Sequence, residues 1–310
     1  MHITYFLGKI ARALFTMVLV VTFVFVVLRA TGDPAQAMLP EDATQQDIEH
    51  FRSMWGLDKP LYEQYGVYWL NILKGNFGQS YRDRRPVTDI MAERLPKTVY
   101  LMTLSIVFAV IIAIPMGVKA ALNRNTFIDR FTMGTAVFGF SMPNFFLGIL
   151  LILLFSVKLK ILPSSGSDSW KHIILPLLTT GLAYIGSYSR FTRSSMLSVL
   201  NKPYIRTAIA GGLSRNRVIY GHALPNAAIP VITIIGATVG RIIAGSIVIE
   251  TVFAWPGVGR LLVTSVGARD LSVVQAIVML LSITIVTANL IVDILYGILD
   301  PRIRTKKGGV

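Results

Sequence analysis

Six apolar runs without Asp, Glu, Lys or Arg constrain the fold of this 310-residue chain more than any other feature. A helix needs about 20 mostly apolar residues to cross the hydrocarbon of a bilayer. A single run can also be a buried helix of a soluble protein, but six in one chain predict six membrane-spanning helices. The runs are residues 13–28, 98–118, 131–157, 173–189, 227–240 and 271–292.

Two of these runs need extension to reach the length of a span. Arg12 and Arg29 can extend the first run, because their charged groups reach the interface while their stems stay in the apolar layer. The fifth run reaches full length only if the helix continues through Arg241 to Phe253. The composition agrees with a membrane protein, since 15% of the residues are charged and a soluble domain has about 25%.

The positive charge of the chain predicts its orientation. The net charge of +14 is concentrated in short clusters at the ends of apolar runs. Such charge can also bind nucleic acid, but this placement suits membrane orientation better. With six spans, four basic segments fall on one side, and short basic loops stay in the cytoplasm. These segments are residues 2–12, 119–130, 190–217 and 302–307. We therefore expect both termini in the cytoplasm and no nucleic acid as a partner.

The N-terminal residues 1–30 are predicted to form a short cytoplasmic segment and the first span. The alternative is a cleaved secretory signal, since an apolar stretch is followed by Ala35-Gln36-Ala37. Arg29 and Asp33 precede that cleavage position, which favours a retained span.

Residues 31–97 form the only long non-membrane insertion, and we expect it outside the cytoplasm, with short helices of its own. Thr44 can cap a helix that ends near Gly56, and Pro60 precedes a second helix that ends at Gly75. Tyrosine and tryptophan recur in the second helix, which suits either the membrane–water boundary or packing against the bundle.

Pro86 is predicted to start a third short helix that leads into the second span. The membrane core then comprises residues 98–299, with a cytoplasmic segment at 200–226 and a cytoplasmic tail at 300–310. The chain has no cysteine, so it offers no disulfide and no thiol ligand or nucleophile.

The segment 204–226 is basic although it lies between two apolar runs. It carries Arg206, Arg215 and Arg217, and residues 187–226 contain no Asp or Glu. An ordinary cytoplasmic connector is one interpretation of this pattern, because such loops are usually basic. A docking surface for a partner is the other.

The small residues and prolines of this segment favour docking. Pro203 and Pro225 bracket it and are predicted to change the chain direction. Gly211 and Gly212 separate two short helices that can stand off the membrane, and Ala208 allows a partner to approach closely. A rigid helix of this kind, inserted in a partner, can transmit a motion to the spans.

The spacing in this segment resembles the EAA loop of ABC-transporter permeases, and most closely that of B-type permeases of the oligopeptide/dipeptide/nickel branch. Ala208, Gly212 and Pro225 keep the family spacing, whereas Arg206 and His222 stand where the family pattern has Glu and Ile. The resemblance implies ATPase coupling through Arg206, Thr207, Ala208, Gly211, Gly212, Leu213, Arg215, His222, Leu224 and Pro225.

Further motifs of the same branch follow in order along nearly the whole chain. They are GDP at 32–34, GLDKP at 56–60, GNFGQS at 75–80, ETVFAWPGVG at 250–259 and LDPRIR at 299–304, with Asn76 in place of the usual Asp. The resemblance implies an all-α integral membrane protein with the type I ABC importer (MetI-like) permease fold. Six transmembrane helices and a long external loop between helices 1 and 2 belong to that fold.

The resemblance also implies the assembly and the function. Such a chain is a multi-pass permease of the bacterial cytoplasmic (inner) membrane that moves di- or oligopeptides. It would pair with a second (C-type) permease, two cytosolic ATPases and an extracytoplasmic substrate-binding protein. The chain lacks the G-x-x-x-x-G-K-[ST] loop, so ATP and Mg²⁺ are expected on the ATPases. Nickel chelates, glutathione and opines remain alternative solutes.

Arg241 near the middle of the fifth span is a candidate for the translocation pathway. A charge at the bilayer centre costs about 2.5–3.5 kcal/mol, so it should face a cavity or a partner. We predict that it attracts anionic groups such as peptide carboxylates; a pair with a carboxylate of the partner permease is the alternative. Ser141 and Asn144 are further pathway candidates, and Gly236 with Gly240 forms a close-packing GxxxG face.

The outer end of the fifth span carries Glu250, Trp255, Pro256 and Gly257. Proline and glycine there predict a break into a short re-entrant turn. The residues are candidates for an outer gate or a binding-protein contact, and a plain interfacial loop is the alternative.

Two other classes of protein fit less well. A stand-alone secondary transporter predicts inverted repeats and paired intramembrane carboxylates, and we find neither in the sequence. A membrane enzyme needs a convergent catalytic set, whereas the four histidines are scattered in connecting segments. We expect no catalytic, cofactor or metal residues on this chain.

Overall fold

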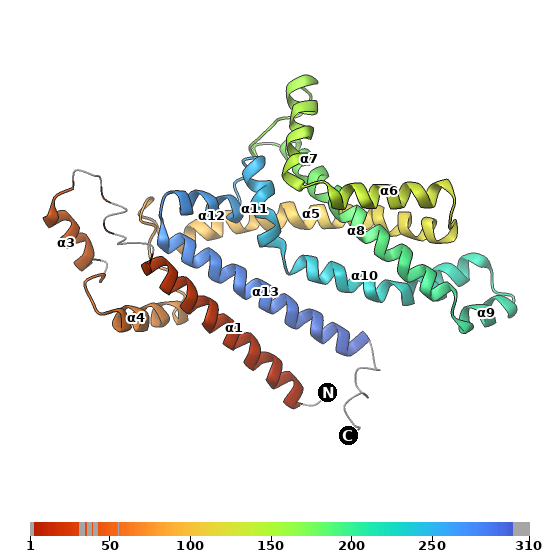
Figure 1. Ribbon diagram of the computed structural model, residues 1–310, viewed down its shortest axis with the longest axis horizontal. Coiled ribbons are helices and arrows are strands. Elements are labelled where there is room, and N and C mark those ends of the chain that lie inside the picture. Colours follow the sequence, from red (N-terminus) through yellow and green to blue (C-terminus); the bar gives the residue numbers. More distant parts are fainter. Residues whose placement is uncertain (1–2, 31–34, 36–38, 40–42, 55, 300–310) are drawn as a thin grey trace. The chain divides into compact units, whose positions relative to one another are not determined.

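The computed structural model describes residues 3–30, 35, 39, 43–54 and 56–299. The GDP motif, the tail at 300–310 and most of the alternative cleavage site lie outside these residues. The described residues form helices joined by turns (Figure 1), and their one β-contact is an isolated bridge between Gln79 and Pro86. This confirms the predicted all-helical class.

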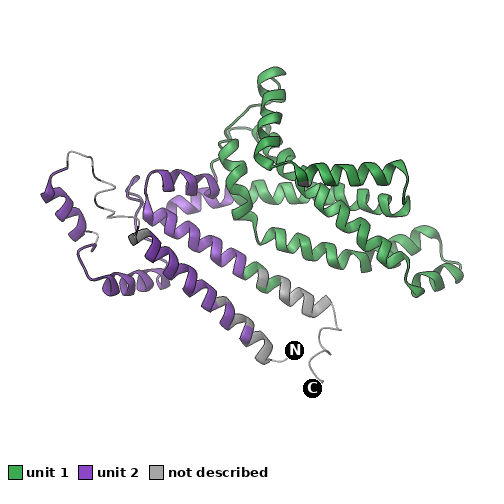
Figure 2. Ribbon diagram, viewed as in Figure 1, with its two compact units in different colours: residues 1, 98–256, 287–310 green, residues 2–97, 257–286 purple. Residues whose placement is uncertain are grey.

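The chain divides into two compact units (Figure 2). Unit 1 comprises mainly residues 98–256 and 287–310, and unit 2 comprises residues 2–97 and 257–286.

Three helices of the described chain are long and apolar enough to cross a membrane. They are Val87–Leu122, Arg217–Val239 and Leu271–Ala288, and the bent pair Phe127–Gly139 and Asn144–Lys158 meets the same criteria together. Length and composition therefore support three or four spans in the described residues. The predicted number of six stays a prediction.

Helix α5 (Val87–Leu122) corrects the sequence interpretation of its first turns. A separate short helix after Pro86 was predicted, but one helix runs from Val87 through the second apolar run. Buried side chains recur at helical spacing along it, from Val87 and Ile90 to Leu101. An uninterrupted buried stripe stabilises one continuous helix.

The third apolar run forms two helical pieces instead of one. Helix α6 (Phe127–Ser141) ends at Met142, whose backbone is extended, and α7 (Asn144–Leu151) continues into the π-helical turn η1 (Ile152–Lys158). The two directions differ by 100°, and the bend between α6 and α7 can be seen in Figure 1. Pro143 explains the break, because proline disfavours helical geometry in the residue before it.

The fifth apolar run is also broken, and the prediction of one helix through Arg241 is wrong. Helix α10 (Leu224–Val239) follows the π-helical turn η3 (Arg217–Ala223), and α11 (Ile242–Val252) begins after Gly240 and Arg241. The chain changes direction at this point (Figure 1).

Helix α8 (Ile174–Leu200), which follows the short helix η2 (Trp170–Ile173), is the centre of unit 1 and packs against α6, α7 and α10. It approaches α5 closely, since a Cβ on Gly117 would lie 2.6 Å from the Ser189 carbonyl oxygen. On the α6 side, Arg193 forms a two-pronged ion pair with Asp129, whose side chain is 5% exposed. Close backbone contact and a paired charge therefore hold α5, α6 and α8 together.

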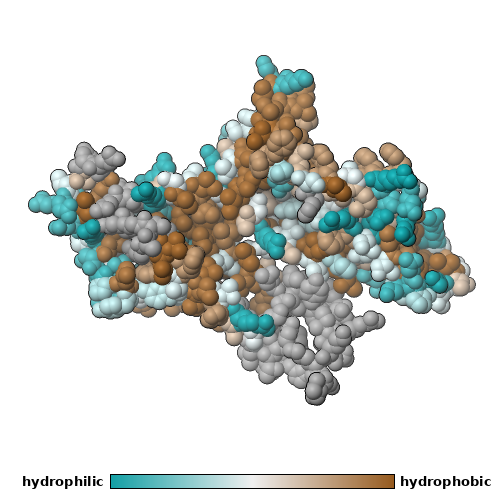
Figure 3. Space-filling model, viewed as in Figure 1, coloured by the Kyte–Doolittle hydropathy of each residue, from teal (hydrophilic) through white to brown (hydrophobic). Residues whose placement is uncertain are grey.

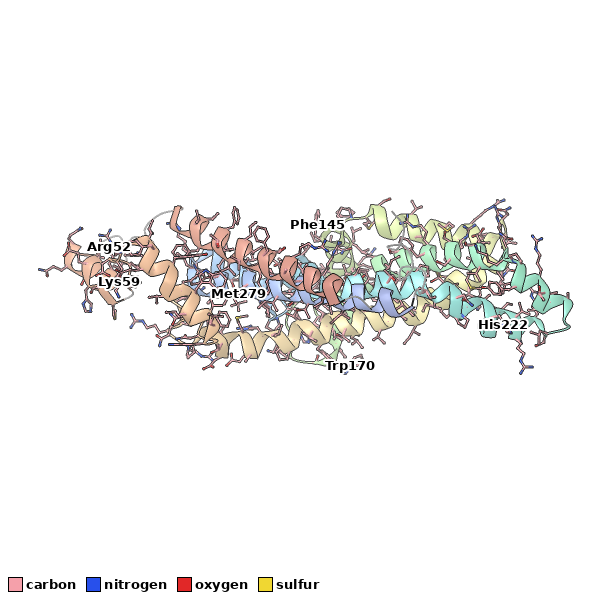
Figure 4. The ribbon with its side chains drawn as sticks, turned by 90° about the horizontal axis from the view of Figure 1, so that it is seen from below. Arg52, Lys59, Phe145, Trp170, His222 and Met279 are labelled. Carbon is pink, nitrogen blue, oxygen red and sulfur yellow. The ribbon has the colours of Figure 1, made fainter. Side chains whose placement is uncertain are left out.

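Unit 2 joins α1 (Ile3–Ala30), α4 (Leu61–Leu73) and α13 (Leu271–Leu299), which has Met279 labelled in Figure 4. Val21, Ile72 and Met279 form its apolar cluster. The Tyr65 hydroxyl lies 2.7 Å from the Thr22 hydroxyl, within hydrogen-bond distance. The rings of α4 thus pack against α1, in line with one of the two interpretations of these aromatics.

Unit 2 also contains α3 (Gln45–Met54) and α12 (Val258–Gly267). The predicted cap of α3 is confirmed, since the Thr44 hydroxyl accepts the Asp47 amide at 3.3 Å and donates to its carboxylate at 2.6 Å. That hydroxyl holds the pKa of Asp47 below its ordinary value. The hydrogen bond from Thr44 to the ionised Asp47 therefore stabilises the folded state at neutral pH. This stabilisation is lost as the pH falls through the lowered pKa of Asp47.

Candidate functional site

Helix α9 (Pro203–Ala210) is the first part of the predicted docking segment. Lys202 before it is extended, and Pro203 occupies the first helical position. A backbone N–H at that position has no partner within the helix, so proline is well tolerated there. The predicted change of direction at Pro203 is therefore confirmed.

The C-terminal end of α9 is a Schellman motif. The Leu213 N–H donates to the Ala208 carbonyl at 3.3 Å, and the Gly212 N–H donates to the Ile209 carbonyl at 3.0 Å. This motif needs a left-handed residue, and Gly212 supplies it with φ of +79°. No atom lies within 4 Å of a Cβ built on Gly212, so in this chain its glycine serves backbone geometry rather than close packing.

One buried side chain anchors α9 to the rest of unit 1. Ile205 is 1% exposed and packs in an apolar cluster with Val118 of α5, Met196 of α8 and Val218 of η3. The sequence interpretation missed Ile205. The available signal was a large apolar residue followed directly by the polar residues Arg206 and Thr207. The anchor fixes which face of α9 is free.

The free face of the segment carries most of the predicted docking residues. Arg206, Thr207, Gly211, Gly212, Arg215, His222 and Pro225 are exposed, whereas Ala208, Leu213 and Leu224 are half-buried. Figure 3 shows hydrophilic residues gathered at the α9 end of unit 1, and Figure 4 labels His222 at that end.

Three large side chains add an apolar component that the sequence interpretation did not include. Tyr204, Ile209 and Tyr220 are 44%, 60% and 58% exposed. Exposed aromatic and aliphatic groups beside arginines are typical of protein interfaces. We call the exposed face of residues 204–225 the α9 surface.

Pro225 does not change the chain direction, which corrects the prediction for the second half of the segment. The chain is helical from η3 through Pro225 into α10. A π turn precedes the proline, and the Asn226 side-chain amide donates to the His222 carbonyl at 2.7 Å. These two features accommodate a residue that lacks its own N–H.

The pathway candidates lie at the two helix breaks of unit 1. Arg241 is exposed and forms no side-chain hydrogen bond or ion pair with any other residue that the structure describes. Ser141 is exposed at the end of α6, and Asn144 is half-buried at the start of α7. Gly240 packs closely, since its Cβ would lie 2.4 Å from the Ala288 Cβ of α13.

The candidates at the outer end of the fifth run are mostly buried. Glu250 is fully buried and accepts the Thr98 hydroxyl at 2.6 Å, so its carboxylate is not available to a binding protein. Trp255 is 5% exposed, Gly257 is buried and Pro256 is half-buried. The predicted helix break is confirmed, because α11 ends at Val252; a role in a gate stays a prediction.

The described residues contain no group of three or more His, Cys, Asp or Glu side chains placed to hold a metal ion. The α9 surface is the best-defined candidate site, because the buried Ile205 anchors its helix and the left-handed Gly212 ends it.

Comparison with known proteins gives matches over nearly the whole length of the chain. Residues 99–305 match the family of binding-protein-dependent transport system inner membrane components, and residues 2–102 match its N-terminal domain. The chain is 47% identical to the glutathione transport system permease protein GsiC of Escherichia coli (strain K12) over 97% of both chains. The protein of the same name from Shigella flexneri serotype 5b is 46% identical over 97% of both.

A solved structure has a similar fold. A chain of the MetNI methionine ABC transporter in an inward-facing conformation matches with a TM-score of 0.51 and 17% identity. The match covers 67% of this chain and 97% of that chain, which supports the MetI-like fold.

Proposed function

The chain belongs to the family of binding-protein-dependent transport system inner membrane components, as a permease subunit of an ABC importer in its oligopeptide/dipeptide branch, and we propose that its solutes are short peptides, including glutathione. The observation that carries the choice of solute is the 47% identity to a glutathione permease over 97% of both chains. Nickel chelates and opines are the alternative solutes.

We propose six spans with both termini in the cytoplasm and residues 31–97 outside. The six apolar runs correspond to α1, α5, the bent pair α6 and α7, α8, the broken pair α10 and α11, and α13. Because the chain has no cysteine, single cysteines can report the topology. In right-side-out vesicles, a membrane-impermeant maleimide should label Ser53→Cys and leave Ser214→Cys unlabelled; the reverse pattern would refute this orientation.

The proposed partners are a second permease, two cytosolic ATPases and a substrate-binding protein. The α9 surface supports the ATPase contact, because it is exposed, basic and partly apolar, while Ile205 holds its helix firmly on unit 1. A helix fixed in this way transmits a push to α5 and α8 as a rigid body. ATP and Mg²⁺ are proposed to bind to the ATPases.

Arg241 is proposed to line the translocation pathway. Its exposure and its lack of a side-chain partner in the described chain support this role, together with its position at a break between two helices. A half-membrane helix break exposes backbone groups, which are tolerated where they face a cavity or another subunit. Ser141 and Asn144, at the other break, are proposed to share this role.

Uptake by the assembled transporter tests the proposed function. The chain is co-expressed with a second permease and two ATPase subunits, reconstituted in proteoliposomes, and supplied with the binding protein. ATP-dependent uptake of trialanine or glutathione is expected. Uptake of a nickel chelate alone, or of no solute, would contradict the choice of peptides.

A further inference from the structure

Unit 2 contains a polar cavity of about 310 Å³ that no family motif assigns to a ligand. Its wall includes residues from the segment before α5, from the first turns of α5, from α12 and from the start of α13. The volume lies at the lower end of the range of about 300–1,000 Å³ for small-molecule sites. Three arginines, Arg82, Arg94 and Arg260, line it.

The buried acid in the wall is already engaged by other groups. Asp270 is 2% exposed, and its Oδ2 accepts the Ser80 hydroxyl at 2.5 Å. Its Oδ1 accepts the N–H groups of Tyr81 at 3.3 Å and Val273 at 3.4 Å. Asp270 thus holds the wall together, and the remaining acid of the lining, Asp83, is exposed.

Two of the arginines form no salt bridge in the described residues. Neither Arg82 nor Arg94 forms a hydrogen bond or ion pair with another residue in the described part of the chain. Glu93, next to Arg94, is paired with Arg85 instead. Arg94 is half-buried, and it shares its electrostatic interaction with Glu93 with the hydrogen-bonded Arg85. An anion bound in the cavity would offset the cost of its partial desolvation.

We propose that this cavity binds the carboxylate of a small peptide. Guanidinium groups offer a planar pair of donors that matches a carboxylate. Part of the cavity wall, from Ser80 to Arg94, belongs to residues 31–97, which are proposed to lie outside. The outer location of the site and the choice of a peptide both rest on the proposed function. The site would hold a peptide by its carboxylate on the outer side before the peptide enters the pathway.

Peptide binding to the assembled transporter without its binding protein tests this proposal. The complex is placed in nanodiscs, and equilibrium dialysis measures radiolabelled trialanine against trialanine amide, which lacks the carboxylate. The free acid should bind about tenfold more tightly than the amide. Arg82→Gln and Arg94→Gln should each remove that difference, because a charge-assisted bond is lost.

Arg84→Gln is the matched control, since Arg84 is exposed in the same segment and does not line the cavity. It should keep the wild-type preference for the free acid. Equal binding of acid and amide, or an unchanged preference in Arg82→Gln, would overturn the proposal. The proposal would also be overturned if Arg82→Gln or Arg94→Gln weakened capture of the binding protein while direct peptide binding stayed normal. The cavity would then receive a side chain of the binding protein.

Uptake separates this proposal from the proposed function. Normal ATP-driven uptake of trialanine without direct binding of the free acid would refute the cavity and leave the peptide importer intact. Carboxylate-dependent binding without any peptide uptake would support the cavity and refute the peptide importer.

Discussion

Replacement of Gly212 distinguishes two explanations for a glycine in the docking segment. The sequence suggests that small residues let a partner approach, whereas the structure shows a left-handed residue in a Schellman motif, with φ of +79°. Gly212→Ala adds the smallest side chain, and Gly212→Asn adds a larger one that tolerates the left-handed region. The two explanations therefore predict opposite orders for these variants.

The size of the expected effect follows from the free surroundings of Gly212. A Cβ at this position would meet no atom of the chain within 4 Å, so the cost within the chain is conformational. An alanine in the left-handed region costs about 1–2 kcal/mol, and an asparagine costs less. A loss of about 1 kcal/mol lowers the population of capped α9 about fivefold relative to frayed forms.

ATPase association and hydrogen exchange provide the readouts. Gly212→Ala should weaken binding of the ATPase subunits to the permease in nanodiscs about fivefold and speed amide exchange in α9, with Gly212→Asn close to wild type. If Gly212→Asn binds the ATPases more weakly than Gly212→Ala while exchange in α9 is unchanged, the conformational argument is wrong. Glycine would then be required at this position because a larger side chain blocks the approach of the ATPase. If both variants bind as the wild type does, the segment is not the coupling surface.

Three further predictions concern unit 1. Gly240→Ala should lower the free energy of unfolding of the detergent-solubilised protein by about 1–3 kcal/mol, read from thermal melting, because its Cβ would lie 2.4 Å from an atom of α13. Gly134→Ala is the control, since its Cβ would have no neighbour within 4 Å, and it should be neutral or stabilising. Arg193→Ala should cost about 3–5 kcal/mol in the same assay by leaving the buried Asp129 unpaired. Adding Asp129→Asn should recover part of that loss, and a wild-type melting temperature for the single variant would contradict the argument. Arg241→Ala should reduce uptake of free-acid peptides more than of their amides at equal expression, and unchanged uptake of every peptide would refute a pathway role.

Local features of this protein follow closely from the sequence. The Thr44 cap and the glycine after α3 are properties of a few adjacent residues, and both helix ends are as predicted. The docking segment was recognisable for the same reason, because its glycines, prolines and arginines follow one another in a short stretch. The helix break after Val252 was also predicted, from a proline and a glycine close together.

The path of the backbone within an apolar run was not predictable in the same way. Residues 131–157 and 227–253 read as continuous spans, yet the helices break at Met142 and at Gly240. An apolar run reports only that its side chains avoid water, and several packed arrangements satisfy that requirement equally. Pro225 shows the converse, since a local helix breaker is accommodated by a π turn before it.

The sequence by itself determined that this chain is helical and membrane-embedded and that one basic segment has the spacing of an ABC permease coupling loop. Those properties depend on composition and on residues near one another in the chain. Only the tertiary structure decided that Ile205 anchors α9, that Glu250 is enclosed and that Arg82, Arg94 and Arg260 share one cavity. Which polar side chains are enclosed and which distant residues converge depends on packing between helices, and the order of residues along the chain does not specify that packing.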